Sequence, residues 1–237
     1  MFINKLTAIV IEKTIITDVL MVIKIKPNSS FVYRPGQYCT VGVNGTERPY
    51  SIVSAPYEEY LELFVELVPD GTLTPNLWNV NSGDMINIRP RAKGIFTLEN
   101  NYDNHFMLAT VTGVAPILSM IRDSLHHGLN SHRFYIIHGA SFEKELAYRS
   151  ELENLSRIHD NIFYIPTLSR PHDPENNRWQ GETGRVNTIF YKYIDKFSLD
   201  HENTVIYACG HPGMIEDVKA QAREIGFRFK EEKYWRD

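Results

Sequence analysis

The sequence predicts a two-domain protein: an N-terminal antiparallel six-stranded β-barrel, then a C-terminal α/β domain built on a parallel sheet. Two observations carry this prediction. The first hundred residues hold short β-branched segments at close spacing, broken by turn residues, with almost no helix. Further along, apolar strands alternate with helices of about 10–15 residues, the pattern of βαβ units. The polar stretch 99–104 separates the two patterns, so we place the domains at residues 1–100 and 101–237.

Six strands and one short helix are predicted for the first domain. Asn44-Gly45 is a strong hairpin signal between the third and fourth strands. The fifth strand alternates apolar residues with Glu62 and Glu66, as a half-exposed strand does. The predicted strands are 6–11, 19–25, 38–43, 48–53, 61–68 and 85–89, and the helix is 75–80.

The second domain is predicted to alternate strand and helix to its end. Its strands are 106–111, 134–138, 162–167, 204–209 and 227–235, and its helices are 115–127, 143–155, 186–194 and 213–225. Ligands of such sheets bind beyond the carboxyl ends of the strands, so the residues that follow each strand are candidates for a site.

Composition excludes several functional classes. A chain of 237 residues, 43% hydrophobic, can bury one or two cores, and a net charge of −4 gives no nucleic-acid footprint. Cys39 and Cys209 are too few for a disulfide framework or a four-cysteine iron–sulfur cluster, and the nine histidines show no metal-ligand spacing. The start of the chain lacks a secretory pattern, and no apolar stretch reaches membrane-spanning length. We therefore expect a cytoplasmic protein without a metal, nucleic-acid or membrane site.

The first motif that carries chemistry is Arg48-Pro49-Tyr50-Ser51, on a predicted strand. Alternate side chains of a strand share a face, so Arg48 and Tyr50 project together while Ser51 points the other way. A guanidinium binds a diphosphate, an aromatic face covers a planar ring, and a hydroxyl bonds to a ring nitrogen. The strip suits a planar, phosphate-bearing cofactor, although four such residues also occur in ordinary strands.

Three further segments also contain residues suited to binding a phosphate-bearing cofactor. In 65–77 a turn opens a helix, whose free N–H groups attract an anion, and Thr72 and Thr74 add hydroxyl donors. The segment 109–116 is a strand-to-helix turn, and Cys209-Gly210-His211-Pro212-Gly213-Met214 ends an apolar strand where Pro212 can open a helix. A capped helix, an ordinary turn and a buried structural cysteine are the simpler interpretations.

Together with Pro35-Gly36-Gln37-Tyr38, these segments resemble the flavin and pyridine-nucleotide signatures of the bacterial-type ferredoxin–NADP reductase superfamily, in order from Pro35 to Trp235. The resemblance implies an FAD-binding barrel and an NADP-binding α/β domain. The residues it assigns to FAD are Arg48, Pro49, Tyr50, Ser51, Val65, Glu66, Leu67, Val68, Gly71, Thr72, Leu73, Thr74, Thr112 and Trp235. Those it assigns to NADP are Thr110, Gly113, Ser141, Arg170, Arg185, Cys209, Gly210, Pro212 and Met214.

The resemblance also implies three catalytic residues. Ser51 would lie near flavin N5, which exchanges hydride with NADPH, and Cys209 beside the nicotinamide carbon that gives up the hydride. Trp235, in a Tyr-Trp pair near the end of the chain, would cover the flavin ring. Cys209 would serve in packing and positioning, and the chemistry would belong to the flavin.

Nucleotide preference rests on Arg170 and Arg185, which match positions that contact the adenosine 2′-phosphate in bacterial members of the family. Each charge-assisted bond is worth about 1.5–3 kcal/mol, enough for a tenfold or greater preference for NADP over NAD. Two positions depart from the family pattern. Val111 stands where glycine is usual, without glycine's freedom at positive φ, and Ser141 stands where an arginine is frequent.

We therefore expect a monomeric FAD-dependent ferredoxin (or flavodoxin)–NADP reductase, which moves hydride between NADPH and flavin and single electrons between flavin and a small carrier protein. A basic cluster at Arg89, Arg91 and Lys93 would steer an acidic carrier, although a solvated surface is the simpler interpretation. Three alternatives stay open: a free-flavin reductase, an NADH-linked reductase component of an oxygenase, and a non-enzymatic nucleotide-binding subunit, which the departures at Val111 and Ser141 would suit.

Overall fold

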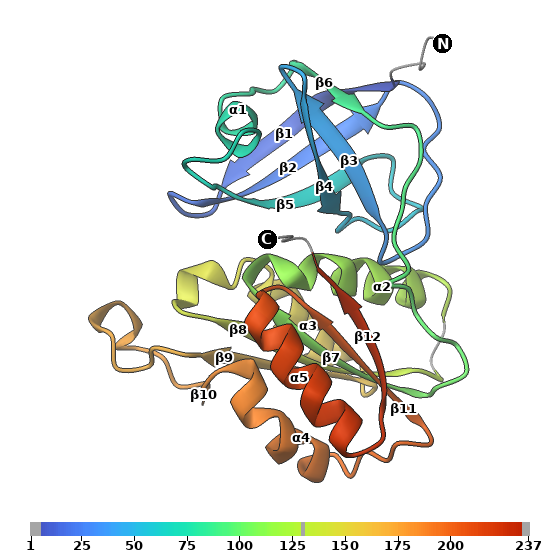
Figure 1. The fold of residues 1–237 in the computed structure, drawn as a ribbon, viewed down its shortest axis with the longest axis vertical. Helices are drawn as coiled ribbons and strands as arrows, with labels where there is room; N and C mark the ends of the chain where they lie inside the picture. The colour runs from blue at the N-terminus through green and yellow to red at the C-terminus, as the bar shows by residue number, and fades with distance from the viewer. Residues whose placement is uncertain (1–5, 129–130, 234–237) are drawn as a thin grey trace. The chain divides into compact units, whose positions relative to one another are not determined.

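The computed structural model describes residues 6–128 and 131–233, which form two compact units (Figure 1). The first unit comprises Met1–Leu98 and Ala115–His126, and the second comprises Glu99–Val114 and His127–Asp237. Helix α2 (Val114–His126) therefore packs with the barrel, although it follows the first strand of the parallel sheet. The domain boundary after residue 100 remains a prediction.

The first unit is a six-stranded antiparallel barrel, which confirms the predicted class. Its sheet has the order β4-β3-β6-β1-β2-β5. The outer strands β4 and β5 meet where Ile52 bridges Leu63 and the Val53 N–H donates to the Glu62 carbonyl at 2.8 Å, which nearly closes the barrel. The strands are β1 (Leu6–Ile15), β2 (Leu20–Pro27), β3 (Tyr38–Val43), β4 (Thr46–Ser51), β5 (Leu61–Glu66) and β6 (Met85–Ile88), with helix α1 (Thr74–Trp78) before β6.

The second unit has a fully parallel sheet, also as predicted. Its order is β10-β9-β8-β7-β11-β12, so the chain moves outward from β7 and returns to the other side of β7 with β11. The carboxyl ends of β7 and β11 therefore flank a topological switch point, where such sheets bind ligands. The strands are β7 (Asn104–Thr110), β8 (Arg133–Ala140), β9 (Ile162–Leu168), β10 (Glu182–Thr183), β11 (Thr204–Cys209) and β12 (Arg228–Glu232).

The helices of this unit include α3 (Arg149–Ile158), α4 (Phe190–Lys196) and α5 (Pro212–Glu224). A single helix over 143–155 was the wrong prediction: one 3₁₀ turn (Glu143–Glu145) precedes α3, and 146–148 separate them. The Glu145 carboxylate folds back to accept from the Ser141 and Phe142 N–H groups at 2.9 and 3.0 Å, which closes the turn. A second 3₁₀ segment (Val186–Ile189) opens the helix predicted at 186–194.

The prediction that Glu62 lies on a half-exposed face of its strand was also wrong. Its exposed fraction is 4%, and the Arg122 guanidinium of α2 lies 3.6 Å from its carboxylate. Helix α2 therefore covers Glu62, which the alternation predicts to be solvent-facing, and Arg122 of that helix supplies the opposite charge.

Helices α2 and α5 have 13 residues each. Within residues 6–128 and 131–233, no helix is both long enough and apolar enough to span a membrane.

Candidate cofactor and nucleotide sites

In the barrel, a hydrogen bond joins the two segments assigned to the flavin. Arg48, exposed on β4, donates from Nη2 to the Thr72 hydroxyl at 3.0 Å, and Nη1 donates to the Glu47 carbonyl at 2.9 Å. An exposed guanidinium and a hydroxyl held side by side are a donor set suited to a diphosphate. Beside them, the Tyr50 ring packs partly against the barrel core, and Ser51 is 7% exposed. Burial raises the pKa of Tyr50, so its phenol stays neutral.

The turn before α1 is fixed by its own hydrogen bonds. The Thr74 hydroxyl donates to the Val68 carbonyl at 3.0 Å and accepts from the Val68 N–H at 2.9 Å. Gly71 also donates to that carbonyl, and a Cβ on Gly71 would stand 2.9 Å from it. Thr74 thus holds the turn together, while Thr72 remains exposed. Of the other residues assigned here, Val65 and Leu73 lie in the barrel core, Leu67 and Val68 are half-buried, and Glu66 is exposed.

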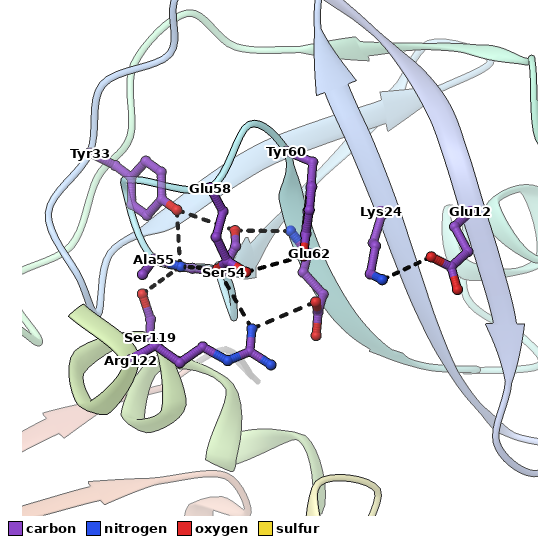
Figure 2. Close-up of polar contacts among 10 residues, drawn as sticks. All are labelled: Glu12, Lys24, Tyr33, Ser54, Ala55, Glu58, Tyr60, Glu62, Ser119 and Arg122. Carbon is purple, nitrogen blue, oxygen red and sulfur yellow. Dashed lines mark hydrogen bonds and ion pairs between the residues drawn. The ribbon is translucent and has the colours of Figure 1, made fainter. Parts of the chain in front are cut away.

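The loop that follows Ser51 is fastened by a network that the sequence did not reveal (Figure 2). The Ser54 carbonyl accepts from the Ser119 hydroxyl of α2 at 2.7 Å and from the Tyr33 hydroxyl at 2.9 Å. The Ser54 hydroxyl accepts from the Glu62 N–H at 3.1 Å. Figure 2 shows Arg122 reaching from the same helix toward Glu58 and Glu62, at 3.7 and 3.6 Å. Helix α2 therefore holds the loop three residues beyond Ser51. These side chains are too far apart in sequence to form a motif.

In the second unit, the motifs after β7 and β11 pack against each other. A Cβ on Gly113 would stand 2.1 Å from the Cys209 carbonyl oxygen. Gly210 has a φ of +124°, and a Cβ there would stand 2.2 Å from the Thr110 hydroxyl oxygen. That oxygen accepts from the His211 N–H at 2.7 Å. Both glycines are therefore required for the two strand ends to meet.

Helix α5 begins directly after this contact. The Nδ1 atom of His211 accepts from the Gly213 N–H at 3.1 Å, so His211 caps the helix and Pro212 occupies its first turn. Met214 is 6% exposed and packs in the core, and Cys209 is fully buried. Sequence analysis missed the capping role of His211, although a polar residue before Pro212 is the usual signal.

Val111 turns the chain out of β7 with a φ of +44°. This conformation is rare for a β-branched residue. Its side chain, like that of Trp179, packs against a small buried cluster of Ala140, Leu146 and Leu168. The valine therefore takes the positive-φ turn that glycine makes easily, and Thr112 and Gly113 follow it in one 3₁₀ turn.

Three assigned polar residues follow neighbouring strands. Ser141 comes directly after β8, Arg170 two residues after β9, and Arg185 two residues after β10. The Arg170 guanidinium lies 5.5 Å from the Phe142 ring centroid, and both arginines are exposed. Gly184 donates to the Leu168 carbonyl at 2.9 Å and accepts from the Thr167 hydroxyl at 2.8 Å, which fixes the segment that leads into Arg185.

Glu232 is a further candidate functional residue at the end of the parallel sheet, and sequence analysis did not identify it. It ends β12 opposite Cys209 in the parallel register, and burial raises its pKa to about 7. A glutamate in a segment of mixed charge such as 228–233 gives no signal in sequence. Trp235 lies outside the described residues.

Within 6–128 and 131–233, no three or more His, Cys, Asp or Glu side chains gather as a metal site requires.

Known proteins share this arrangement. Residues 2–102 match a family described as "FAD-binding domain", and residues 107–220 match one described as "Oxidoreductase NAD-binding domain". The chain is 30% identical over 227 residues to ferredoxin–NADP reductase A of Sorangium cellulosum, covering 89% of this chain and 80% of that protein. It is 26% identical over 225 residues to a ferredoxin–NADP reductase of Pseudomonas aeruginosa, covering 89% and 86%.

A solved structure has the same fold over nearly the whole chain. The ferredoxin NADP+ reductase of Neisseria gonorrhoeae, with bound FAD and NADP, superimposes with a TM-score of 0.85 at 24% identity, covering 97% of this chain and 98% of that one.

The two matched domains and the two-unit fold define a flavin-dependent oxidoreductase with an FAD-binding domain and a pyridine-nucleotide-binding domain. The chain belongs to the ferredoxin–NADP reductase superfamily, as the likeness to the Sorangium enzyme demonstrates. It is an enzyme, a flavin-dependent oxidoreductase.

Proposed function

We propose that this reductase exchanges electrons with a ferredoxin or flavodoxin, holding FAD in residues 1–100 and NADP(H) in residues 101–237. The observation that carries the proposal is the packed pair of turns after β7 and β11, at the topological switch point of the parallel sheet. Bound FAD would supply the exchange between two-electron and one-electron chemistry. A cytoplasmic location and a monomeric state complete the proposal.

In the barrel, we assign Arg48 and Thr72 to the diphosphate, Tyr50 to the flavin ring and Ser51 to a hydrogen bond near the reacting ring nitrogen. The contact between Arg48 and Thr72 supports the first assignment, because it holds two phosphate donors in place before ligand arrives. The placement of Tyr50 supports the second, because its ring packs on the barrel core while only partly buried, which leaves aromatic surface for a planar ligand. The network around Ser54 keeps the backbone after Ser51 in a fixed position. Trp235 remains assigned to the face of the flavin.

In the α/β domain, we assign Thr110 and Gly113 of the turn after β7, and the turn at Cys209–Met214, to the nicotinamide half of NADP(H), with Cys209 as a packing residue. Its complete burial supports that role, since a buried thiol is a poor nucleophile. Arg170 and Arg185 are assigned to the 2′-phosphate, with Ser141 as a neutral donor. Both arginines are exposed, and each extends from a strand end of the same sheet edge.

The surface near Lys93 is the proposed docking site for the carrier. The Arg89 guanidinium is engaged by the Glu47 carboxylate at 2.7 Å. Arg91 and Lys93 are exposed, and within the described residues neither has an ion-pair partner. Steering by these two cations predicts that Lys93→Glu slows reduction of an acidic carrier at low salt and has little effect at high salt.

An anaerobic titration of the flavin-loaded protein with NADPH, and separately with NADH, tests the proposal. We expect near-stoichiometric NADPH to bleach the visible flavin band, with NADH at least tenfold weaker. Arg170→Gln and Arg185→Gln should each reduce that preference, while Arg178→Gln, an exposed arginine between them, should leave it unchanged.

Other results would replace the proposal. An equal or better response to NADH would favour an NADH-linked reductase. A protein that binds FAD only weakly, and reduces added free flavin, would favour a free-flavin reductase.

A further inference from the structure

Asn176 is a buried amide in the excursion between β9 and β10. Its exposed fraction is 1%, although its neighbours Glu175 and Asn177 are exposed. It lies in a 3₁₀ turn (Pro174–Asn176) that Asp173 caps by accepting from the Glu175 N–H at 3.0 Å. A buried amide is stable only when its donors and acceptor are used.

Its three hydrogen bonds go to the loop after β8 and to the start of its own excursion after β9. Nδ2 of Asn176 donates to the Ser141 carbonyl at 2.9 Å and to the Arg170 carbonyl at 2.8 Å. Oδ1 accepts from the Glu143 N–H at 3.1 Å. One side chain therefore ties the loop after β8 to the loop after β9, where the proposed 2′-phosphate ligands Ser141 and Arg170 begin.

The amide bonds to main-chain atoms, and the side chains of Ser141 and Arg170 remain available. The Arg170 guanidinium is exposed and rests 5.5 Å from the Phe142 ring, itself in the tied loop. An exposed ion pair between Lys144 and Glu175 spans the same loops at 2.5 Å, but such surface pairs contribute little. Asn176 is thus a buried polar connection between these two loops.

We propose that Asn176 is a positioning residue for nucleotide specificity: it pre-orients Ser141 and Arg170 for the 2′-phosphate of NADP(H). The proposal rests on the proposed function, because it needs Arg170 to contact that phosphate. A ligand bound by pre-oriented groups loses less ordering entropy, so the amide contributes to affinity without touching the nucleotide. Contacts with the rest of the nucleotide do not depend on it.

Calorimetric titration of the FAD-loaded protein with 2′,5′-ADP and with 5′-AMP isolates the 2′-phosphate. For Asn176→Ala we expect about a tenfold weaker Kd for 2′,5′-ADP, equivalent to roughly one charge-assisted contact, and less than a twofold change for 5′-AMP. The KM for NADPH should rise in parallel, with kcat at saturation within about twofold. Asn177→Ala, an exposed neighbour, should behave as wild type.

A double-mutant cycle with Arg170→Gln tests whether Asn176 acts through Arg170. The effect of Asn176→Ala on 2′,5′-ADP should shrink by more than half when Arg170 is already glutamine. Equal losses for 2′,5′-ADP and 5′-AMP, or wild-type affinity for both, would overturn the proposal. If wild type does not distinguish the two ligands, the assignment of the 2′-phosphate site itself fails, which is a separate result.

Discussion

The imidazole Nε2 of His138 lies 3.0 Å from the carbonyl oxygen of Val111, the residue that turns the chain out of β7 with a φ of +44°. A carbonyl only accepts, so Nε2 carries the proton and Nδ1 accepts from the Tyr164 hydroxyl at 3.2 Å. A β-branched residue in this region stores about 1–3 kcal/mol of strain, which the surrounding structure must offset. His138 therefore helps to hold the turn after β7 in its strained form.

The buried histidines predict that the folded protein loses stability in acid. Burial lowers the pKa of His138 to about 4, and burial together with His132 lowers the pKa of His105 to about 3. Both values lie below the ordinary 6.5, so the unfolded chain binds more protons and stability is lost as pH falls from about 6.5 toward 4. Urea unfolding between pH 7.5 and 4.5 should show this decline.

The His138→Leu variant separates the two contributions. At pH 7.5 it should be less stable by about 1–3 kcal/mol, because the Val111 carbonyl loses its donor. Its stability should also fall less steeply below pH 6.5, since one buried imidazole is gone. An unchanged acid slope would show that His138 is not the titrating group.

Gly113→Ala should destabilise the protein more than the addition of one methyl group usually does. The added methyl of Gly113→Ala would stand 2.1 Å from the Cys209 carbonyl oxygen, so the β7 and β11 turns must separate. We expect a loss of about 1–3 kcal/mol and weaker binding of NADP(H). Gly213→Ala is the matched control for stability, because its nearest neighbours are His211 ring atoms at 3.3 Å. Denaturant melts of both variants and a nucleotide titration of Gly113→Ala would check this, and equal losses of stability would contradict it.

Removal of Arg122 should destabilise the barrel. Arg122→Met leaves the 4%-exposed Glu62 carboxylate without the cation at 3.6 Å, and breaking such a buried pair costs about 3–5 kcal/mol. Adding Glu62→Gln removes the buried charge as well, so the double variant should recover part of the loss. Urea unfolding of the single and double variants measures this coupling, and strictly additive losses would argue against it.

Glu232→Gln should change stability at neutral and alkaline pH, whereas the buried histidines act at acid pH. Burial raises the Glu232 pKa to about 7, so the stability that its proton contributes is complete below about pH 4.5 and is lost as pH rises from there through 7. The glutamine variant should match wild type at pH 4.5 and exceed it at pH 8.5, by about 1 kcal/mol after allowance for solvent screening. Thermal melts at the two pH values test this, and an equal difference at both would exclude titration of Glu232.

Much of the fold was predictable because it depends on local patterns. Strand β3 was predicted at its observed bounds, Tyr38–Val43, because turn residues bound a β-branched run. The exception at 143–155 has a tertiary cause. Its residues suit a helix, but the Glu145 carboxylate caps the preceding loop, and Leu146 and Tyr148 are buried where a regular helix would begin.

The sequence by itself determined the two-domain class, the order of the motifs and the likeness to a reductase family, because propensity and motif spacing are written along the chain. Only the tertiary structure decided that Arg48 meets Thr72, that Arg122 neutralises Glu62, and that Asn176 joins the loops of Ser141 and Arg170. Each of these contacts joins residues at least six positions apart, by bonds whose energy depends on distance and burial. No local pattern encodes those two quantities, so they exist only once both cores have formed.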